Sequence, residues 1–199
     1  MRRIVVSEFV SLDGVMEDPG GAEGSKHGGW TFKFDRGPEG DRFKLDELMA
    51  SDALLLGRVT YEAFAAAWPS ISDEAGFAEK MNGMPKYVVS RTLKSGGWGP
   101  TTILSGDAAA EITRVKEGEG GELLVAGSAR LVQALIEAEL VDECRLMVFP
   151  IVLGSGKRLF GETSSARTFR LASTETVGPD GVVILNYERA ATPEPRKSQ

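Results

Sequence analysis

Glycine, hydroxyl and guanidinium side chains gather directly after three short apolar segments of this chain. These residues are Gly57, Arg58 and Thr60, then Ser90 and Arg91, and finally Gly127, Ser128 and Arg130. Free backbone N–H groups at a helix start attract phosphate, glycine allows close approach, and arginine adds a charge-assisted hydrogen bond. Three such turns together indicate a dinucleotide site more strongly than any one of them.

Each turn alone also has a simpler interpretation, which stays open. Thr60 can be an ordinary helix N-cap, with Arg58 as a surface arginine. Residues 154–158, with the sequence GSGKR, do not form a P-loop, because Ile151 stands where the first glycine is required and Arg158 where Ser or Thr is required. A Walker-type kinase or ATPase is therefore excluded.

Metal and thiol chemistry lack the necessary side chains. The chain has one histidine, His27, and one cysteine, Cys144. Zinc sites and Cys–His nucleophile sites need several such groups close together, so no metal site is predicted. The chemistry is expected to come from carboxylates, hydroxyls or a bound cofactor, with Cys144 as a core thiol.

Composition favours a small-molecule partner. The net charge is -6, and no cluster of Lys and Arg offers the positive surface that nucleic acids or anionic membranes require. No segment is long and apolar enough for a membrane span or a signal peptide, and a lone cysteine makes no internal disulfide. These observations predict a cytoplasmic protein.

The elements that position these residues alternate along the chain. Strands are predicted at residues 4–10, 53–56, 87–89, 101–104 and 123–126, and helices at 41–50, 61–68, 74–81, 108–116 and 128–139. Residues 143–149, 168–177 and 182–188 follow without a long helix and predict an antiparallel edge. The fold class is therefore α/β, a mostly parallel sheet with helices on both faces. One domain is expected over residues 1–189, with a disordered tail at 190–199.

A long irregular stretch, residues 17–40, contains many glycines with Trp30, Phe32 and Phe34 between them. Long loops inside a compact domain are usually lids or substrate walls, and the alternative is a floppy insertion. We interpret this one as a substrate wall, because three aromatic side chains are costly to leave in water.

Four motifs in a fixed order carry a family resemblance: SLDG at 11–14, LLGRVTYE at 55–62, VSR at 89–91 and VAGS at 125–128. Together they resemble the dihydrofolate-reductase-like superfamily. Residues 149–160 resemble the branch that contains the reductase domain of the bifunctional riboflavin-biosynthesis deaminase/reductase, rather than true dihydrofolate reductases. The resemblance covers about residues 1–188 and depends on motif order and spacing.

The resemblance implies a three-layer reductase fold that binds NADPH, and a homodimer. Gly57, Arg58 and Thr60 match the pyrophosphate and adenosine-phosphate contacts, and Ser90 and Arg91 match the 2′-phosphate contacts. The second phosphate-binding turn matches Gly127, Ser128 and Arg130. In relatives two glycines joined by a cis peptide often form that turn, so a cis Gly127–Ser128 bond stays an open question here.

The resemblance also implies substrate residues. Counting back from Arg58 by the family's spacing places the substrate carboxylate at Asp41, with Glu39 two residues earlier; the alternative is a helix N-cap at Asp41. Substrate contacts are expected from Asp13, Trp30, Gly154 and Ser155; the alternative for Asp13 is that it holds a turn.

Two functions follow from these residues. The first is an NADPH-dependent reductase of a small organic substrate, because the cofactor carries the hydride chemistry and the fold supplies position. The substrate class, whether pterin, pyrimidine ribitylamine or another carbonyl or imine, stays open. The alternative is a non-catalytic NADPH-binding module, which a closed, polar-lined pocket beside the nicotinamide would distinguish from an enzyme.

Overall fold

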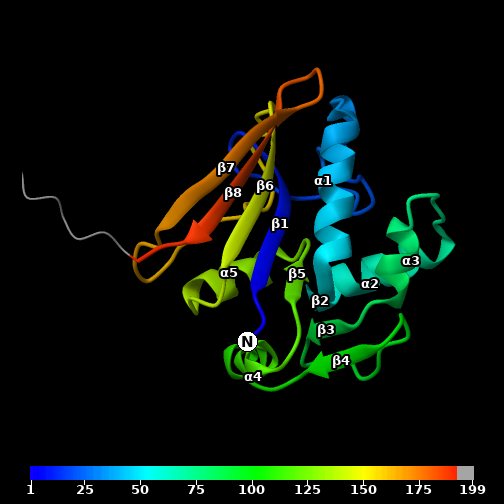
Figure 1. Cartoon of the computed structure of the whole chain (residues 1–199), viewed down its shortest axis with the longest axis vertical. Helices are drawn as coiled ribbons and strands as arrows, with labels where there is room; N and C mark the ends of the chain where they lie inside the picture. The colour runs from blue at the N-terminus through cyan, green and yellow to red at the C-terminus, as the bar shows by residue number, and fades with distance from the viewer. Residues whose placement is uncertain (192–199) are drawn as a thin grey trace, which may run out of the picture.

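A computed structural model describes residues 1–191 of the chain, and eight strands of these residues form one sheet in the order β4-β3-β2-β5-β1-β6-β8-β7 (Figure 1). The strands are β1 (Ile4–Ser11), β2 (Ser51–Gly57), β3 (Lys86–Val89), β4 (Thr101–Leu104), β5 (Glu122–Val125), β6 (Glu143–Phe149), β7 (Phe169–Val177) and β8 (Val182–Arg189). The helices are α1 (Gly37–Ala50), α2 (Arg58–Ala67), α3 (Phe77–Gly83), α4 (Ala108–Glu117) and α5 (Ala129–Glu137), with short 3-10 turns η1 (Trp30–Lys33) and η2 (Trp68–Ser70).

Strand direction agrees with the predicted α/β class, with one correction. The strands from β4 to β6 in this order are all parallel, and β8 and β7 are antiparallel additions. The prediction that residues 143–149 belong to the antiparallel edge is wrong, because β6 pairs in parallel with β1 from Val5 to Ser11. The preceding helix, α5, is the crossover that brings the chain back to start a parallel strand.

Alternating side chains of the central strands build two cores. On one face, Ile4 and Val6 of β1 pack with α4 and α5. On the other face, Val5 and Leu54 pack with α1, α2 and α3. Because successive residues of a strand point to opposite faces, short runs without polar residues are buried on both sides. The result is a sheet with helices on both faces (Figure 1).

A third cluster lies under the antiparallel extension and includes Trp30, which is fully buried. Its ring meets Phe149 edge-on, with centroids 5.4 Å apart, and its indole nitrogen donates a hydrogen bond of 2.9 Å to the Glu17 carbonyl. The prediction that Trp30 contacts substrate is therefore wrong: the side chain anchors the long loop to β6. Phe34 packs on the same Phe149 ring, whereas Phe32 is 80% exposed.

The ends of several elements differ from expectation. Helix α1 begins at Gly37 rather than at residue 41, because a glycine with positive φ and a proline at the second position open it earlier. The predicted tail, residues 190–199, lies outside the described residues except for 190 and 191, and the Ala190 N–H donates to the Thr168 carbonyl. No helix among residues 1–191 is long and apolar enough to cross a membrane.

Candidate active site at the carboxyl edge of the sheet

The predicted phosphate-binding turns lie in a row along one edge of the sheet. β3, β2, β5 and β1 are consecutive parallel strands, so their carboxyl ends, and the turns at Ser90, Gly57, Gly127 and Ser11 that follow, share that edge. In open α/β sheets ligands bind in the crevice outside these strand ends. The sequence motifs are thus brought together by topology, although their ligand contacts stay predictions.

The edge contains a notch beside β1. β5 pairs with β1 only as far as Val6, whereas β1 continues to Ser11 alongside β6. Residues 7–11 therefore extend past the end of β5, with the Gly127–Ser128 turn at the base of the step. We call this stagger between the ends of β5 and β1 the notch.

Two of the turns are joined directly by Ser128. Its hydroxyl accepts a hydrogen bond of 2.9 Å from the Gly57 N–H and donates one of 2.8 Å to the Thr60 hydroxyl. The N-cap interpretation of Thr60 is wrong, since the N-cap of α2 is Gly57. A Cβ added to Gly57 would lie 3.0 Å from the Ser128 hydroxyl, and one added to Gly127 would lie 2.9 Å from a Thr60 methyl. The glycines are needed for the close approach of the two turns.

The turn before α5 has an unusual backbone. Gly127 and Ser128 both have left-handed φ, 72° and 68°, and the peptide that joins them is trans. A left-handed residue followed by a helical one directs successive N–H groups toward the same point, the arrangement that binds anions. The helix dipole of α5 adds to this attraction.

The arginines at this edge differ in availability. Arg58 pairs with Glu62, at 2.7 Å, one turn along α2. Arg91 and Arg130 are exposed, and neither has an ion pair within residues 1–191. Ser90 is buried, and its hydroxyl accepts hydrogen bonds from the backbone N–H groups of Thr92 and Leu93. It therefore shapes the turn after β3.

Asp13 fastens the end of β1 to the loop after β6. Its carboxylate accepts hydrogen bonds from the Ser11 hydroxyl, 2.7 Å, and from the N–H groups of Leu153, 3.1 Å, and Gly154, 2.9 Å. The Ser11 hydroxyl and these N–H groups lower the pKa of Asp13 to about 2. Of the two interpretations of Asp13, these contacts are those of a turn-holding residue. Ser155 is exposed, with its hydroxyl 3.3 Å from His27 Nε2.

The predicted acids are not in the site. The prediction that Asp41 is the substrate carboxylate is wrong, because its side chain is exposed and pairs with Arg36 at 2.7 Å. The N-cap alternative is also wrong, since the N-cap of α1 is Arg36. Glu39, in the first turn of α1, is exposed as well.

Helix α1 instead buries a different carboxylate, Glu47, which is 5% exposed. Ser7 of β1 donates to it at 2.8 Å, and Lys44 pairs with it and donates to the Ser7 hydroxyl at 2.8 Å. The Lys44 ammonium also lies 5.0 Å from the centre of the Phe9 ring. The second carboxylate oxygen, Oε2, is buried without a hydrogen-bond partner among the described residues. Ser7 follows Val6, the last β1 residue paired with β5, so this cluster borders the notch.

A second buried carboxyl, Glu8, lies next along β1 and points to the opposite face. It is 6% exposed, and its Oε1 also has no partner in the described part of the chain. Burial raises the pKa of Glu8 to about 8, and the backbone N–H of Gly127 partly opposes this. Two incompletely bonded carboxyl groups thus flank the notch: Glu8 of β1, and Glu47 of α1, which is bonded to the neighbouring β1 residue, Ser7.

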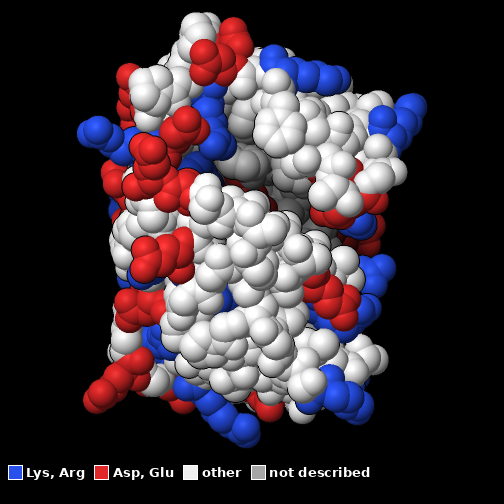
Figure 2. Space-filling model, turned by 90° about the vertical axis from the view of Figure 1, so that its right-hand side faces the viewer, with Lys and Arg blue, Asp and Glu red and all other residues white. Residues whose placement is uncertain are grey.

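The face that carries α1 to α3 is hollowed in its upper half (Figure 2). A cavity of about 400 Å³ lies elsewhere, near the end of β8, and is lined by residues such as Val141, Arg167 and Phe169. It contains none of the glycine turns, so we place the candidate site at the notch on chemical grounds.

Comparison with known proteins agrees with this arrangement of strands and turns. The model of the RibD C-terminal domain matches residues 2–183. The chain belongs to the RibD C-terminal domain family. Two relatives from Bacillus subtilis (strain 168) align with this chain over nearly their whole length. Uncharacterized protein YwjB is 30% identical, and the alignment covers 95% of this chain and 99% of YwjB. Uncharacterized protein YyaP is 28% identical, and the alignment covers 94% of each chain.

Solved structures show the same fold. A putative riboflavin biosynthesis protein from Shewanella sp. PV-4 superposes with a TM-score of 0.74 at 23% identity, covering 95% of this chain and 99% of that one. Dihydrofolate reductase from Enterococcus faecalis, complexed with NADP(H) and RAB-propyl, gives a TM-score of 0.59 at 14% identity, covering 95% and 97%. The family match confirms the riboflavin-type branch inferred from the motifs, and the solved structures confirm a dihydrofolate-reductase-like fold.

Membership in the RibD C-terminal domain family does not by itself identify the carboxylates, and the sequence carried a weak signal for each. Glu8 interrupts an otherwise apolar strand, at residues 4–10, with a single charge. Glu47 stands immediately before the predicted core residue Leu48. A charged residue within a core-facing run is the pattern to look for, because an unpaired acid is seldom buried for stability alone.

Proposed function

We propose that this protein is an NADPH-dependent reductase of a small organic substrate, with the cofactor phosphates on the turns at Gly57 and Gly127. The observation that supports this best is the joining of these turns by Ser128 at the carboxyl edge, beside the notch in β1. When bound, NADPH supplies the hydride.

The residues present fit this cofactor. The left-handed Gly127–Ser128 backbone and the first N–H groups of α5 supply the anion-binding donors, and α5 directs its positive end at the same turn. The Gly57 N–H is bonded to the Ser128 hydroxyl and holds this turn in place. Arg91 follows β3, next to β2, where its exposed guanidinium can pair with a 2′-phosphate. Arg58 needs to leave Glu62 before it can contribute. We therefore assign the preference for NADPH over NADH to Arg91.

On the substrate side, we assign to Glu47 the carboxylate role first expected of Asp41. Its free Oε2 accepts a hydrogen bond from a ring N–H or an exocyclic amine, as a carboxylate does when it orients a pterin or aminopyrimidine. Lys44 and Ser7 fix the other oxygen, so the side chain is held in one orientation. The substrate class is thus a nitrogen heterocycle with at least one hydrogen-bond donor.

The buried polar cluster also separates the reductase from a non-catalytic NADPH-binding module. A module that only binds the dinucleotide needs no orphaned carboxylate oxygen beside the nicotinamide position, and leaving one unpaired costs about 1–3 kcal/mol. The cluster of Ser7, Lys44 and Glu47 therefore supports catalysis.

Cofactor titration followed by a substrate screen tests the proposal. NADPH fluorescence at constant protein concentration is expected to saturate at lower concentrations than NADH fluorescence. NADPH oxidation is then followed with a dihydropterin, an aminopyrimidine bearing a ribityl side chain, and a simple aldehyde. Absence of binding of either cofactor contradicts the proposal, and binding without oxidation of any substrate favours the binding module.

We also propose a homodimer, as the riboflavin-type resemblance implies. The edge strand β7 gives this proposal no apolar support, because most of its exposed side chains are polar and the exposed large hydrophobic one is Leu171, at 45%. Sedimentation at micromolar concentration tests the proposal: a single species at the chain mass of 21.3 kDa contradicts it.

A further inference from the structure

Glu8 is an acid in a strand face that is otherwise core. Ile4, Val6 and Val10 share its face of β1, and each is at most 5% exposed. A carboxyl buried in such surroundings costs free energy unless hydrogen bonds replace its water. Glu8 is only partly compensated, since its Oε1 has no partner within residues 1–191.

The carboxyl lies directly behind the turn that opens α5. β1 and β5 run in register from Ile4 opposite Leu123 to Val6 opposite Val125, so Glu8 is level with Gly127. The Gly127 N–H faces its carboxyl group. The outer side of the same turn, with the left-handed Ser128 and the first N–H groups of α5, is the phosphate position of the proposed function.

No cation is dedicated to Glu8. The titratable groups that act on it are Lys44 and Glu47 of α1 and Cys144 of β6. Lys44 is already paired with Glu47 and bonded to Ser7, and the Cys144 thiol, whose pKa burial raises to about 12, stays neutral. Near pH 7 the carboxyl is therefore in its protonated form, because burial raises its pKa to about 8.

We propose that Glu8 is a positioning residue that couples binding of the dinucleotide phosphates at the Gly127–Ser128 turn to retention of a proton on its buried carboxyl. This inference rests on the proposed function. When Glu8 is protonated, the turn has no negative charge behind it, and its N–H groups are free to bind phosphate. When Glu8 loses its proton, its charge competes for the Gly127 N–H and repels the phosphate through a low-dielectric interior.

Proton binding by Glu8 and phosphate binding at the turn are thermodynamically linked, so each strengthens the other, and the pKa of Glu8 sets the size of the effect. If the ligand binds only the protonated form, its affinity falls as pH rises through the pKa of Glu8 in the free protein. With that pKa at about 8, binding at pH 9 is expected to be about tenfold weaker than at pH 7. The 2′-phosphate contributes little here, because its second pKa is about 6.

The test compares three proteins: the natural chain, Glu8→Gln, and the control Glu79→Gln, which makes the same substitution at an exposed position of α3. NADPH dissociation constants are measured by fluorescence at pH 7, 8 and 9. The natural chain and Glu79→Gln are expected to weaken about tenfold from pH 7 to 9, and Glu8→Gln to stay within about twofold of its value at pH 7. Titration calorimetry at pH 8 in two buffers of different ionisation enthalpy is expected to show proton uptake for the natural chain and none for Glu8→Gln.

Equal pH dependence and equal proton uptake in the natural chain and Glu8→Gln would overturn the inference while leaving the proposed function intact. Absence of NADPH binding by all three proteins at every pH would instead refute the proposed function, and this inference with it. The glutamine is isosteric, and the melting temperatures of the three proteins verify that each variant is folded.

Discussion

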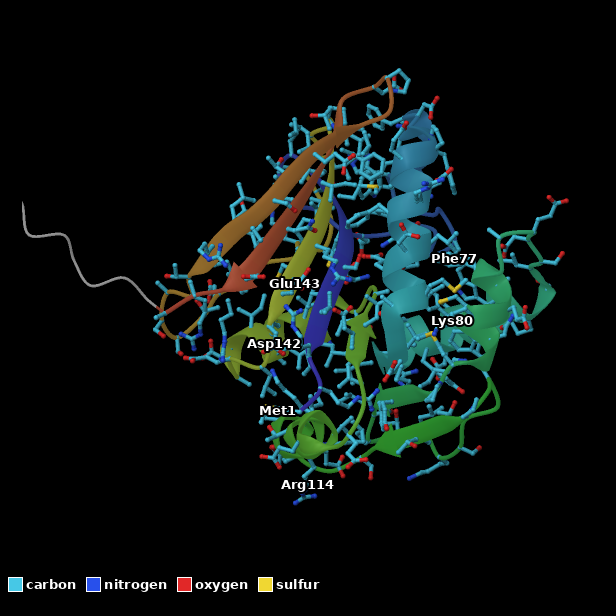
Figure 3. The ribbon with its side chains drawn as sticks, in the orientation of Figure 1. Met1, Phe77, Lys80, Arg114, Asp142 and Glu143 are labelled. Atoms are coloured by element: carbon cyan, nitrogen blue, oxygen red, sulfur yellow. The ribbon has the colours of Figure 1, made fainter. Side chains whose placement is uncertain are left out.

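The two ends of the parallel sheet are built from the same residue types and use them differently. At the amino end, around the start of β6, Glu143 accepts hydrogen bonds from Arg3, at 2.8 Å, and Arg145, at 2.7 Å, and Lys116 pairs with Asp142. Figure 3 shows Asp142 and Glu143 on the side of the molecule where Met1 and Arg114 also lie. Each of these acids is already paired with a cationic side chain, so no ligand is needed to neutralise it.

At the carboxyl end, acids and bases are left incomplete. Glu8 and Glu47 each have a buried oxygen without a partner, and Arg91 is exposed without an ion pair in the described chain. The amino end has one such atom too, Oε2 of Glu122, but the other oxygen of Glu122 pairs with Arg145 at 3.0 Å. The two ends therefore differ in their unpaired charged groups, since neither Glu8 nor Arg91 has an ion pair among residues 1–191. Such groups are available to a ligand.

Substituting glutamine for an acid at each end sharpens this comparison most, because we expect opposite signs. Glu8 has its pKa raised from 4.5 to about 8, so the native state binds its proton more tightly than the unfolded state. The contribution of this bound proton to the free energy of unfolding is complete below pH 4.5 and is lost as pH rises through about 8. Glu8→Gln is therefore expected to raise the free energy of unfolding at pH 9 by about 3–5 kcal/mol, with the gain vanishing toward pH 4.5.

Glu143→Gln is the matched control at the amino end. It weakens the contacts to Arg3 and Arg145, so the free energy of unfolding is expected to fall by about 1–3 kcal/mol. Urea denaturation of both variants at pH 5, 7 and 9 measures the two effects. Destabilisation by both substitutions at pH 9 would remove the distinction between the two ends.

The next effect is on turnover, once a substrate has been found. Glu47→Gln keeps the shape of the side chain and removes its charge, so a substrate oriented by that carboxylate is expected to react about 10²-fold more slowly. Asp41→Asn, at the exposed position on the same helix, is expected to leave the rate unchanged. Circular dichroism and melting temperature check that each variant is folded. A large rate loss in Asp41→Asn and none in Glu47→Gln would restore the assignment made from spacing.

Features that depend on neighbouring residues could be predicted from the sequence, and features that depend on contacts between distant residues could not. The turns at Gly57, Ser90 and Gly127 were predicted because a strand, a turn and a helix start are encoded within about ten consecutive residues. Parallel pairing then brings them to one edge. The acids were missed because Glu8 and Glu47 acquire their meaning from contacts with Gly127 and Ser7, far away in the chain.

Spacing failed at α1 for a related reason. The count that selected Asp41 assumes the helix length of the family. Helix α1 instead starts at Gly37, and its buried acid, Glu47, is six residues after Asp41. Trp30 was placed at the substrate because aromatic residues in a glycine-rich loop are ambiguous: the ring can cover a ligand or, as here, the core. No local pattern distinguishes these two outcomes.

The cofactor preference gives a smaller effect. Arg91→Ala is expected to weaken NADPH binding by about 2 kcal/mol and to leave NADH binding nearly unchanged, because only NADPH has the extra phosphate. Arg58→Ala is expected to have a weaker effect, since Arg58 must first give up its ion pair with Glu62. Fluorescence titrations with both cofactors measure the preference. Equal losses for NADPH and NADH in Arg91→Ala would show that Arg91 does not contact the 2′-phosphate.

The smallest expected effect concerns the hydroxyl that joins the two turns. Ser128→Ala removes the acceptor for the Gly57 N–H and the donor to Thr60, at a cost of about 1 kcal/mol in folding free energy. Its effect on cofactor affinity is expected to be several-fold, because the turns at Gly57 and Gly127 are then no longer fixed relative to each other. Arg3→Ala, which breaks exposed contacts at the amino end, is the control: we expect a stability loss of at most about 1 kcal/mol and no change in affinity. If Ser128→Ala lowers stability by the same amount as Arg3→Ala and leaves NADPH affinity unchanged, the link between the two turns serves folding alone, and the carboxyl end loses one of its distinctions from the amino end.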